Sequence, residues 1–158
     1  DVQVFTSLYP LANHDLLRRI EYPSLNPEEV SAFARALQKH RLINRVVFTH
    51  LGRVRRDDII PRLADFCLQM DGAEWSVVSG LFQRRVIISV RNAGYVKSAG
   101  EVVQKLFPDP ETAGGHRTMA KVNISWVDFK KLFQIRSAAA VADSIIGAFL
   151  RSIEEDRH

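Results

Sequence analysis

The feature that most constrains the fold is a pair of neighbouring strand-like runs in the middle of the chain. Residues 75–82 (WSVVSGLF) and 86–91 (VIISVR) are rich in β-branched and aromatic side chains, and Gln83, Arg84 and Arg85 alone separate them. A link of this length favours an antiparallel hairpin. A two-stranded hairpin is not stable by itself in water, so further strands and helices must cover its apolar face.

Amphipathic helical patterns stand upstream of this hairpin. Asn26 predicts the N-cap of a helix over residues 27–40, where apolar side chains recur at helical spacing. A second helix is expected over residues 57–70, with Asp57 or Asp58 as its cap. The other expected elements are a strand-like segment over 1–5, a short helix over 13–20, strands over 45–49 and 122–126, a helix over 98–107 that Ser98 caps, and a last helix that Ser137 caps. Together they predict an α/β fold, a mixed sheet of about four to five strands with packed helices.

The length of 158 residues suits a domain with its own core, and 46% hydrophobic with 25% charged residues is typical of a globular protein. We expect residues 1–25 to be the tail of an interdomain connection, 26–136 the main folded domain and 137–158 a C-terminal helix. Because the first residue is Asp1 rather than methionine, we expect a fragment of a longer protein.

Composition also limits the partners that we expect. No apolar run approaches the ~20 residues that cross a bilayer, and no signal peptide is visible. We therefore expect a cytoplasmic protein with no membrane partner. The net charge of +4 permits an anionic ligand without requiring one. The single cysteine, Cys67, stands among apolar residues and is expected in the core.

The most specific local motif is AGGHRTMA at residues 113–120, which we interpret as the opening of a short helix. Gly114 and Gly115 would let a ligand approach the backbone closely, and free N–H groups at a helix start attract an anion. His116 adds a hydrogen-bond donor and Arg117 a positive charge. The motif predicts a phosphate or carboxylate site. The alternative is a helix-start turn with a surface histidine.

A second anchor is expected on the strand at residues 86–91. Because side chains alternate along a strand, Ser89 and Arg91 share the face opposite Val86, Ile88 and Val90. An arginine on a strand face can hold a phosphate through two hydrogen bonds, although a surface ion pair is the alternative. We expect this strand end and the glycine motif to converge on one anionic ligand.

The order of these motifs resembles the DHHA1 domain of the DHH phosphoesterases. The similar stretches are SVR at 89–91, GEVV at 100–103, Phe107 and the Gly-Gly-His turn with its following Met-Ala, and upstream residues 51–66 also look similar. The resemblance covers roughly residues 5–126 and implies that residues 26–136 are a DHHA1-like substrate-binding domain. The subset concerned is similar to bacterial nanoRNases and 3′-phosphoadenosine phosphatases, in which an N-terminal DHH domain uses two metal ions, commonly manganese.

The resemblance implies that Gly114, Gly115 and His116 hold a substrate phosphate, while Ser89 and Arg91 contact the phosphate or the nucleotide. The implied ligands are short single-stranded RNA or a phosphorylated nucleotide. The implied protein partner is the N-terminal DHH domain of the same protein, and a homodimer is an alternative to a monomer. This chain would then be part of a hydrolase, an oligoribonuclease or phosphatase, that is inactive without its other half.

Some features depart from that family or are missing from this chain. Many relatives have a third glycine where Ala113 stands and a glycine where Lys121 stands. Lys121 adds a cation beside the motif, which either tightens phosphate binding or indicates that the site has lost it. No Asp-His-His triplet occurs. We therefore predict no metal site and no cofactor in this chain, with manganese bound by the missing DHH domain.

Two other functions remain open from the sequence. Similar domains are also found in alanyl-tRNA synthetases, where they help to bind tRNA, so a stand-alone RNA-binding or nucleic-acid-binding module without hydrolytic activity is the first alternative. A regulatory domain that binds a nucleotide signal is the second.

Overall fold

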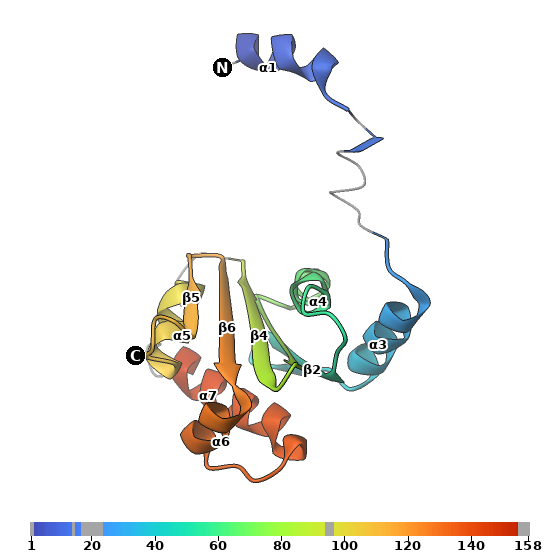
Figure 1. Cartoon of the computed structure of the whole chain (residues 1–158). Coiled ribbons are helices and arrows are strands. Elements are labelled where there is room, and N and C mark those ends of the chain that lie inside the picture. Colours follow the sequence, from blue (N-terminus) through green and yellow to red (C-terminus); the bar gives the residue numbers. More distant parts are fainter. Residues whose placement is uncertain (1, 14, 17–23, 94–96, 155–158) are drawn as a thin grey trace. The chain divides into compact units, whose positions relative to one another are not determined.

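The computed structural model describes residues 2–13, 15–16, 24–93 and 97–154, which fall into two compact units, 1–31 and 32–158 (Figure 1). The first unit contains α1 (Val2–Leu8), the short 3-10 helix η1 (Tyr9–Leu11) and the start of α3 (Pro27–Gln38). The expected strand over residues 1–5 is wrong, because α1 is helical there. A helix satisfies its backbone hydrogen bonds within the segment, whereas a strand needs a partner. Most of the expected helix over 13–20 lies outside the described residues.

The predicted N-cap of α3, Asn26, is confirmed, and Glu29 completes a capping box that was not predicted. The Glu29 N–H donates to the Asn26 side-chain oxygen at 2.9 Å, and the Asn26 N–H donates to the Glu29 carboxylate at 3.0 Å. These two bonds satisfy backbone donors that an uncapped helix start would leave open. The helix ends at Gln38, two residues before the predicted end.

The second unit is built on a six-stranded sheet with the order β1-β2-β3-β4-β6-β5. The strands are β1 (Arg41–Ile43), β2 (Val46–Arg53), β3 (Trp75–Phe82), β4 (Arg85–Asn92), β5 (Ala113–Gly115) and β6 (Met119–Ser125). All neighbours pair antiparallel except β2 and β3, which are parallel and are joined through α4 (Ile59–Cys67). The mixed α/β class is confirmed, and the sheet exceeds the predicted count because β1 and β5, each three residues long, were not expected.

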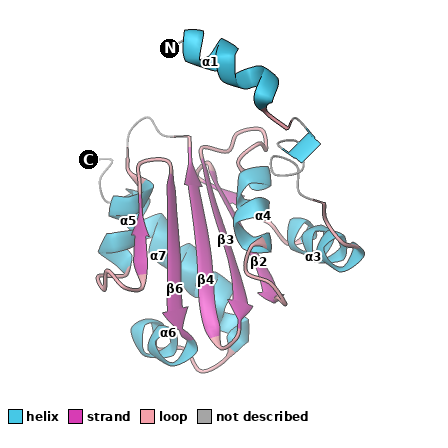
Figure 2. Cartoon of the chain, turned by 45° about the horizontal axis from the view of Figure 1, so that its top comes forward, coloured by secondary structure: helices cyan, strands magenta, loops and turns pink. Residues whose placement is uncertain are grey.

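Helices cover the two faces of the sheet unequally. On one face lie α5 (Ala99–Leu106), α6 (Trp126–Phe133) and α7 (Val141–Glu154), preceded by the 3-10 helix η2 (Ala138–Ala140). On the other face α4 and residues 32–37 of α3 pack against β2, β3 and β4. In Figure 2, α4 stands in front of the sheet, α7 passes behind it, and β6 is in full view. The α4 face of β6 and β5 therefore lies open.

Several local predictions, of one helix, one strand end and two helix caps, are wrong. Residues 113–120 form no helix: they form β5, a turn and the start of β6. Trp126, expected to end a strand, begins α6. The side chains of Asp57 and Asp58 do not cap α4, since Asp57 pairs with Lys121 and Asp58 with Arg56. Ser137 precedes η2 without a side-chain cap, and α7 begins only at Val141.

The sole cysteine is a core residue, as predicted. Cys67 is buried at the end of α4, and burial raises the pKa of its thiol to about 11. A thiol with so high a pKa stays protonated at neutral pH and is a poor nucleophile.

Within the described residues, no single helix is long and apolar enough to cross a membrane. The bent pair formed by residues 126–133 and 138–153, with 65° between its parts, meets the length and composition criteria. Both of its helices contribute side chains to the core on the α5 face of the sheet.

Candidate ligand-binding site at the open end of the sheet

Strand β4 presents its polar residues to the α4 face of the sheet, as the alternation predicted. Val86, Ile88 and Val90 belong to the core on the opposite face. Ser89 is 2% exposed, and its hydroxyl oxygen accepts a hydrogen bond from the Arg91 Nη1 at 2.9 Å. Ser89 therefore supports Arg91 instead of pointing to solvent.

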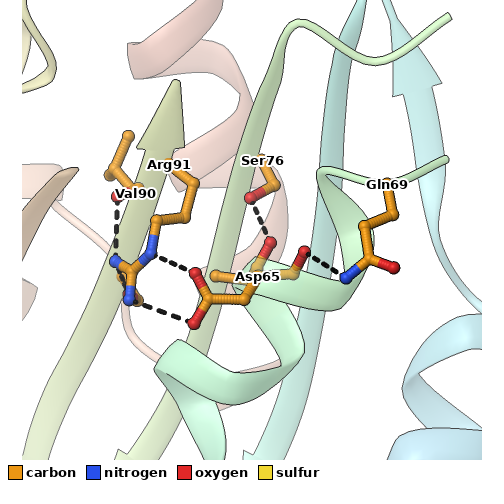
Figure 3. Close-up of polar contacts among 7 residues, drawn as sticks. Asp65, Gln69, Ser76, Val90 and Arg91 are labelled. Carbon is orange, nitrogen blue, oxygen red and sulfur yellow. Dashed lines mark hydrogen bonds and ion pairs between the residues drawn. The ribbon is translucent and has the colours of Figure 1, made fainter. Parts of the chain in front are cut away.

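Arg91 is held by a carboxylate from α4. Its Nε donates to the Asp65 Oδ1 at 2.6 Å, and its Nη2 lies 3.5 Å from the Asp65 Oδ2 (Figure 3). The Arg91 side chain is 16% exposed, whereas the Asp65 side chain is 58% exposed. The expected ion pair, the alternative to phosphate binding, is therefore present in this structure.

The hydrogen bonds of Arg91 leave little capacity for a ligand. Nη1 donates to Ser89 and also to the Val90 carbonyl at 3.2 Å, and Asp65 occupies Nε and one side of Nη2. A guanidinium has five N–H groups, so one Nη2 hydrogen has no protein acceptor among the described residues. A phosphate that took two hydrogen bonds from Arg91 would have to displace Asp65.

The glycine motif contains the tight turn between β5 and β6. Three backbone hydrogen bonds attach this turn to neighbouring elements. The carbonyls of His116 and Arg117 accept hydrogen bonds from the N–H groups of Gly100 and Ala99, each at 2.9 Å. The Thr118 carbonyl accepts from the backbone N–H of Asn92, at the end of β4, also at 2.9 Å. The turn is thereby attached to the first residues of α5 and to β4, while the side chains of residues 116–118 are exposed.

Asn92 strengthens this junction between the two predicted anchors. It is 5% exposed, and its side-chain amide donates to the Lys97 carbonyl at 2.5 Å and to the Arg117 carbonyl at 3.4 Å. Sequence analysis did not assign Asn92 a role. Its position directly after Arg91 was the available signal, because a polar residue at the end of a buried strand usually has a bonding role.

The two glycines of the motif have different environments. A Cβ on Gly115 would collide with Ala120 and lie 2.5 Å from the Met119 carbonyl oxygen, so the chain itself requires this glycine. A Cβ on Gly114 would meet no described atom within 4 Å. Only Gly114 therefore leaves free space where a ligand can approach the backbone.

The strand register brings both anchors to the same end of the sheet. Arg91 pairs with Met119, and the His116 N–H donates to the Met119 carbonyl at 2.7 Å. Two strand spacings thus separate the backbones of Arg91 and His116, about 10 Å. A ligand of dinucleotide size is long enough to contact both Arg91 and the turn.

A further cation, Lys121, lies beside the motif on the uncovered face of β6. Lys121 pairs with Ser89 on β4 and with Gly114 on β5, so all three share the α4 face. Its side chain is 54% exposed and its Nζ lies 3.2 Å from the Asp57 carboxylate. We define the open surface as Arg91, Gly114, His116, Arg117 and Lys121.

The observed turn changes the physical basis of anion binding at residues 113–117. The predicted helix start would have supplied free backbone N–H groups and a dipole. In the structure the His116 N–H is bonded to Met119, and the motif opens no helix. Attraction for an anion must come from the side chains of the open surface.

The donor atoms of the described residues do not form a metal centre. Among the described residues, no group of three or more His, Cys, Asp and Glu side chains is arranged to hold an ion. A two-metal hydrolase needs several such side chains to converge on a pair of ions. The residues of this site can position an anion, and we derive no metal-dependent step from them.

Comparisons with known proteins give the fold a context. No family model matches the chain. Over 149 residues it is 26% identical to uncharacterized protein MJ1633 of Methanocaldococcus jannaschii, covering 94% of this chain and 30% of that protein.

Two solved structures share the fold. One is an exopolyphosphatase-related protein from Bacteroides fragilis, with a TM-score of 0.66 and 14% identity over 91% of this chain and 40% of that one. The other is the DHH domain of a member of a ribosomal-protein family, with a TM-score of 0.51 and 15% identity over 89% and 33%. The chain thus spans less than half the length of each of these three proteins, and its fold is that of a part of the DHH-domain proteins.

Proposed function

We propose that this chain is the substrate-binding part of a DHH-family phosphoesterase. Its ligand is short single-stranded RNA or a small phosphorylated nucleotide, and the open surface holds the phosphate end. The catalytic metals, manganese among them, are bound by the DHH domain of the same protein. A partial match to DHH-domain folds supports this division of roles.

One observation carries the proposal. Two anchors that are separate in the sequence, Arg91 on β4 and the turn at residues 114–117, lie at the same end of the sheet, about 10 Å apart, beside an uncovered strand face. The hydrogen bonds to Asn92, Ala99 and Gly100 fix the turn before any ligand arrives. A site that is rigid beforehand spends less binding free energy on ordering itself.

The open surface suits a ligand whose phosphate is exposed and can contact several cations. His116 and Arg117 are exposed, and Lys121 and Arg91 are each already paired with one carboxylate. These ion pairs hold the two cations in fixed positions but weaken the attraction of the surface for an anion. Binding by such a surface therefore depends on a ligand phosphate that competes with Asp57 and Asp65, and we expect modest affinity in the absence of the DHH domain.

Hydrolysis of a 5′-labelled RNA dinucleotide tests the division of roles. We expect the complete protein to release mononucleotides in the presence of manganese and the isolated chain of 158 residues to release none. The reason is that the described side chains form no metal centre. Product is measured by gel electrophoresis over the same time course for both proteins.

Each outcome of that experiment is informative. Turnover by the isolated chain, free of contaminating nuclease, would show that our assignment of catalysis to another domain is wrong. If neither protein cleaves but the chain binds longer RNA with length-dependent affinity, it is an RNA-binding module without hydrolytic activity.

Replacing His116 with alanine tests the turn as a ligand contact. The side chain is exposed, and the bonds that fix the turn use the backbone, so His116→Ala should leave the melting temperature unchanged within about 2 °C. We expect its affinity for a 5′-phosphorylated RNA dinucleotide to fall about tenfold, the effect of one charge-assisted hydrogen bond. Fluorescence anisotropy measures the change.

The matched control is His40→Ala, at an exposed histidine two residues after the end of α3. It should bind the dinucleotide as the unmodified chain does. Equal losses in the two variants, or unfolding of His116→Ala, would remove the turn from the proposed site.

A further inference from the structure

A cavity of about 380 Å³ lies away from the open surface, between β2, β3 and α7. Its walls include Phe48 and Val77 from the strands and Ile145 from α7, which are each at most 2% exposed. These side chains belong to the core on the α5 face of the sheet, whereas Arg91 stands on the α4 face. The volume lies within the range of small-molecule sites, about 300–1,000 Å³.

Positive side chains stand at the rim of this cavity. Arg35 and Lys39 come from the end of α3 and the residue after it, and Arg41 comes from β1. All three are exposed, and among the described residues only Arg41 has a carboxylate partner, Asp143, at 3.2 Å. Three cations and one carboxylate leave a net charge of +2 on these four lining side chains.

A polar pair lies deeper in the same cavity. The Nδ1 of His50 is 2.9 Å from the hydroxyl oxygen of Ser79, which is 2% exposed. Burial lowers the pKa of His50, so its imidazole is neutral at pH 7 and can accept or donate a hydrogen bond. Nothing in the proposed function of the open surface uses these two residues.

The cavity thus combines an apolar floor, a neutral polar pair and a cationic rim. Apolar walls with few convergent polar groups are the usual make-up of a small-molecule site. Arginine and lysine at the rim suit a phosphate, because the guanidinium offers paired donors and the ammonium a point charge. The floor of Phe48, Val77 and Ile145 suits a flat or apolar group on the same molecule.

We propose that this cavity binds a small phosphorylated molecule with an aromatic group, of the size and chemistry of a nucleoside monophosphate. The phosphate meets Arg35 and Lys39, and the aromatic group enters between β2 and α7, beside His50 and Ser79. The site is independent of the open surface, so this proposal stands or falls separately from the proposed function.

Nuclear magnetic resonance titrations test the site directly. AMP, adenosine and inorganic phosphate are each added to the ¹⁵N-labelled chain, and the amide shifts are followed. We expect AMP to bind at least about tenfold more tightly than either of its parts, because both ends of the cavity are then engaged. The shifted amides should cluster in residues 35–41, 48–51 and 139–146.

Charge-matched variants separate a site from general attraction to a basic protein. Arg35→Ala/Lys39→Ala should weaken AMP binding at least about tenfold. Arg136→Ala/Arg151→Ala removes two exposed cations that do not line the cavity, and it should change the affinity less than about twofold. Equal losses in the two double variants would mean non-specific electrostatic binding and would overturn the proposal.

A third variant tests the cavity itself with its charges intact. Ala142 is half-buried on α7 and lines the hollow, and leucine is a good helix former. Ala142→Leu should fill the space and reduce AMP affinity to that of inorganic phosphate, with the melting temperature preserved. Unchanged AMP affinity at the cavity amides in this variant, or the absence of AMP-induced shifts in residues 35–41, 48–51 and 139–146 of the unmodified chain, would overturn the proposal, whereas shifts at residues 89–91 and 114–117 report on the open surface alone.

Discussion

Gly115→Ala is expected to destabilise the chain by about 3 kcal/mol, near the upper end of the cost of overpacking. A Cβ at this position would lie 2.5 Å from the Ala120 Cα and from the Met119 carbonyl oxygen. Both are backbone atoms of β6, and they cannot retreat without disturbing the pairing of β6 with β5 and β4. The free energy of unfolding, measured in urea, gives the size of the effect.

The neighbouring glycine provides the matched control. Gly114→Ala introduces the same methyl group one residue away, where no described atom lies within 4 Å. We expect no loss of stability and a gain of at most about 1 kcal/mol, since alanine restricts the unfolded chain more than glycine does. Equal destabilisation by both substitutions would contradict the assigned register of β5 against β6.

The same pair of variants separates structure from ligand binding. If a phosphate approaches the backbone at Gly114, the added methyl group should weaken dinucleotide binding in a fully folded chain. Gly115→Ala cannot report on binding, because any loss would follow from the altered fold. Gly114 is therefore the glycine whose proposed contact with a ligand can be measured.

These two glycines also show where reading the sequence failed. A Gly-Gly-His stretch followed by Met-Ala has no alternation of apolar side chains, and the three residues of β5 have little intrinsic strand preference. Their pairing depends on β6 and on the close approach of α5, where a Cβ on Gly100 would lie 2.7 Å from the Gly115 carbonyl oxygen. Such tertiary contacts cannot be read from local spacing.

Local signals did predict the elements that depend on local chemistry. The bounds of β3 match the strand expected over residues 75–82. Strand β4 is one residue longer at each end than the strand expected over residues 86–91. The Ser98 hydroxyl accepts from the Glu101 N–H at 3.4 Å, as its capping-box pattern indicated. The placement of Ser89 and Arg91 on one face followed from strand alternation alone.

The partners of the predicted site residues were the part that the sequence concealed. Asp65 stands 26 residues from Arg91, and Asp57 stands 64 residues from Lys121. Both carboxylates reach the open surface only because α4 lies over β3 and β4. Asp65 did offer one signal, since it is a charged residue between the buried positions Ala64 and Cys67 of α4. A charge in such a place often has a partner on the surface that the helix covers.

Asp65→Asn is expected to tighten the binding of a 5′-phosphorylated dinucleotide about tenfold, whereas Arg91→Ala should weaken it at least about tenfold. In the structure Asp65 occupies the Nε and one Nη2 hydrogen of Arg91, so it competes with a phosphate for the same donors. Removal of the carboxylate charge frees those donors. Removal of the guanidinium eliminates them.

The stability effects should be smaller and should differ between the two variants. Asp65 is 58% exposed, so water screens its attraction to Arg91, and we expect Asp65→Asn to cost less than about 1 kcal/mol. Arg91 is 16% exposed and also bonds Ser89 and the Val90 carbonyl, so Arg91→Ala should cost about 1–3 kcal/mol. Urea unfolding of both variants measures this difference.

The double variant Asp65→Asn/Arg91→Ala decides whether Asp65 competes with the ligand phosphate for the donors of Arg91. If Asp65 weakens binding only by occupying Arg91, then Asp65→Asn has no effect once Arg91 is alanine, and the two substitutions are strongly non-additive. If Asp65→Asn instead weakens binding in the presence of Arg91, the carboxylate is needed to position the guanidinium. If neither substitution changes the affinity, Arg91 is a structural residue that joins β4 to α4, and the phosphate must be held by the turn and Lys121.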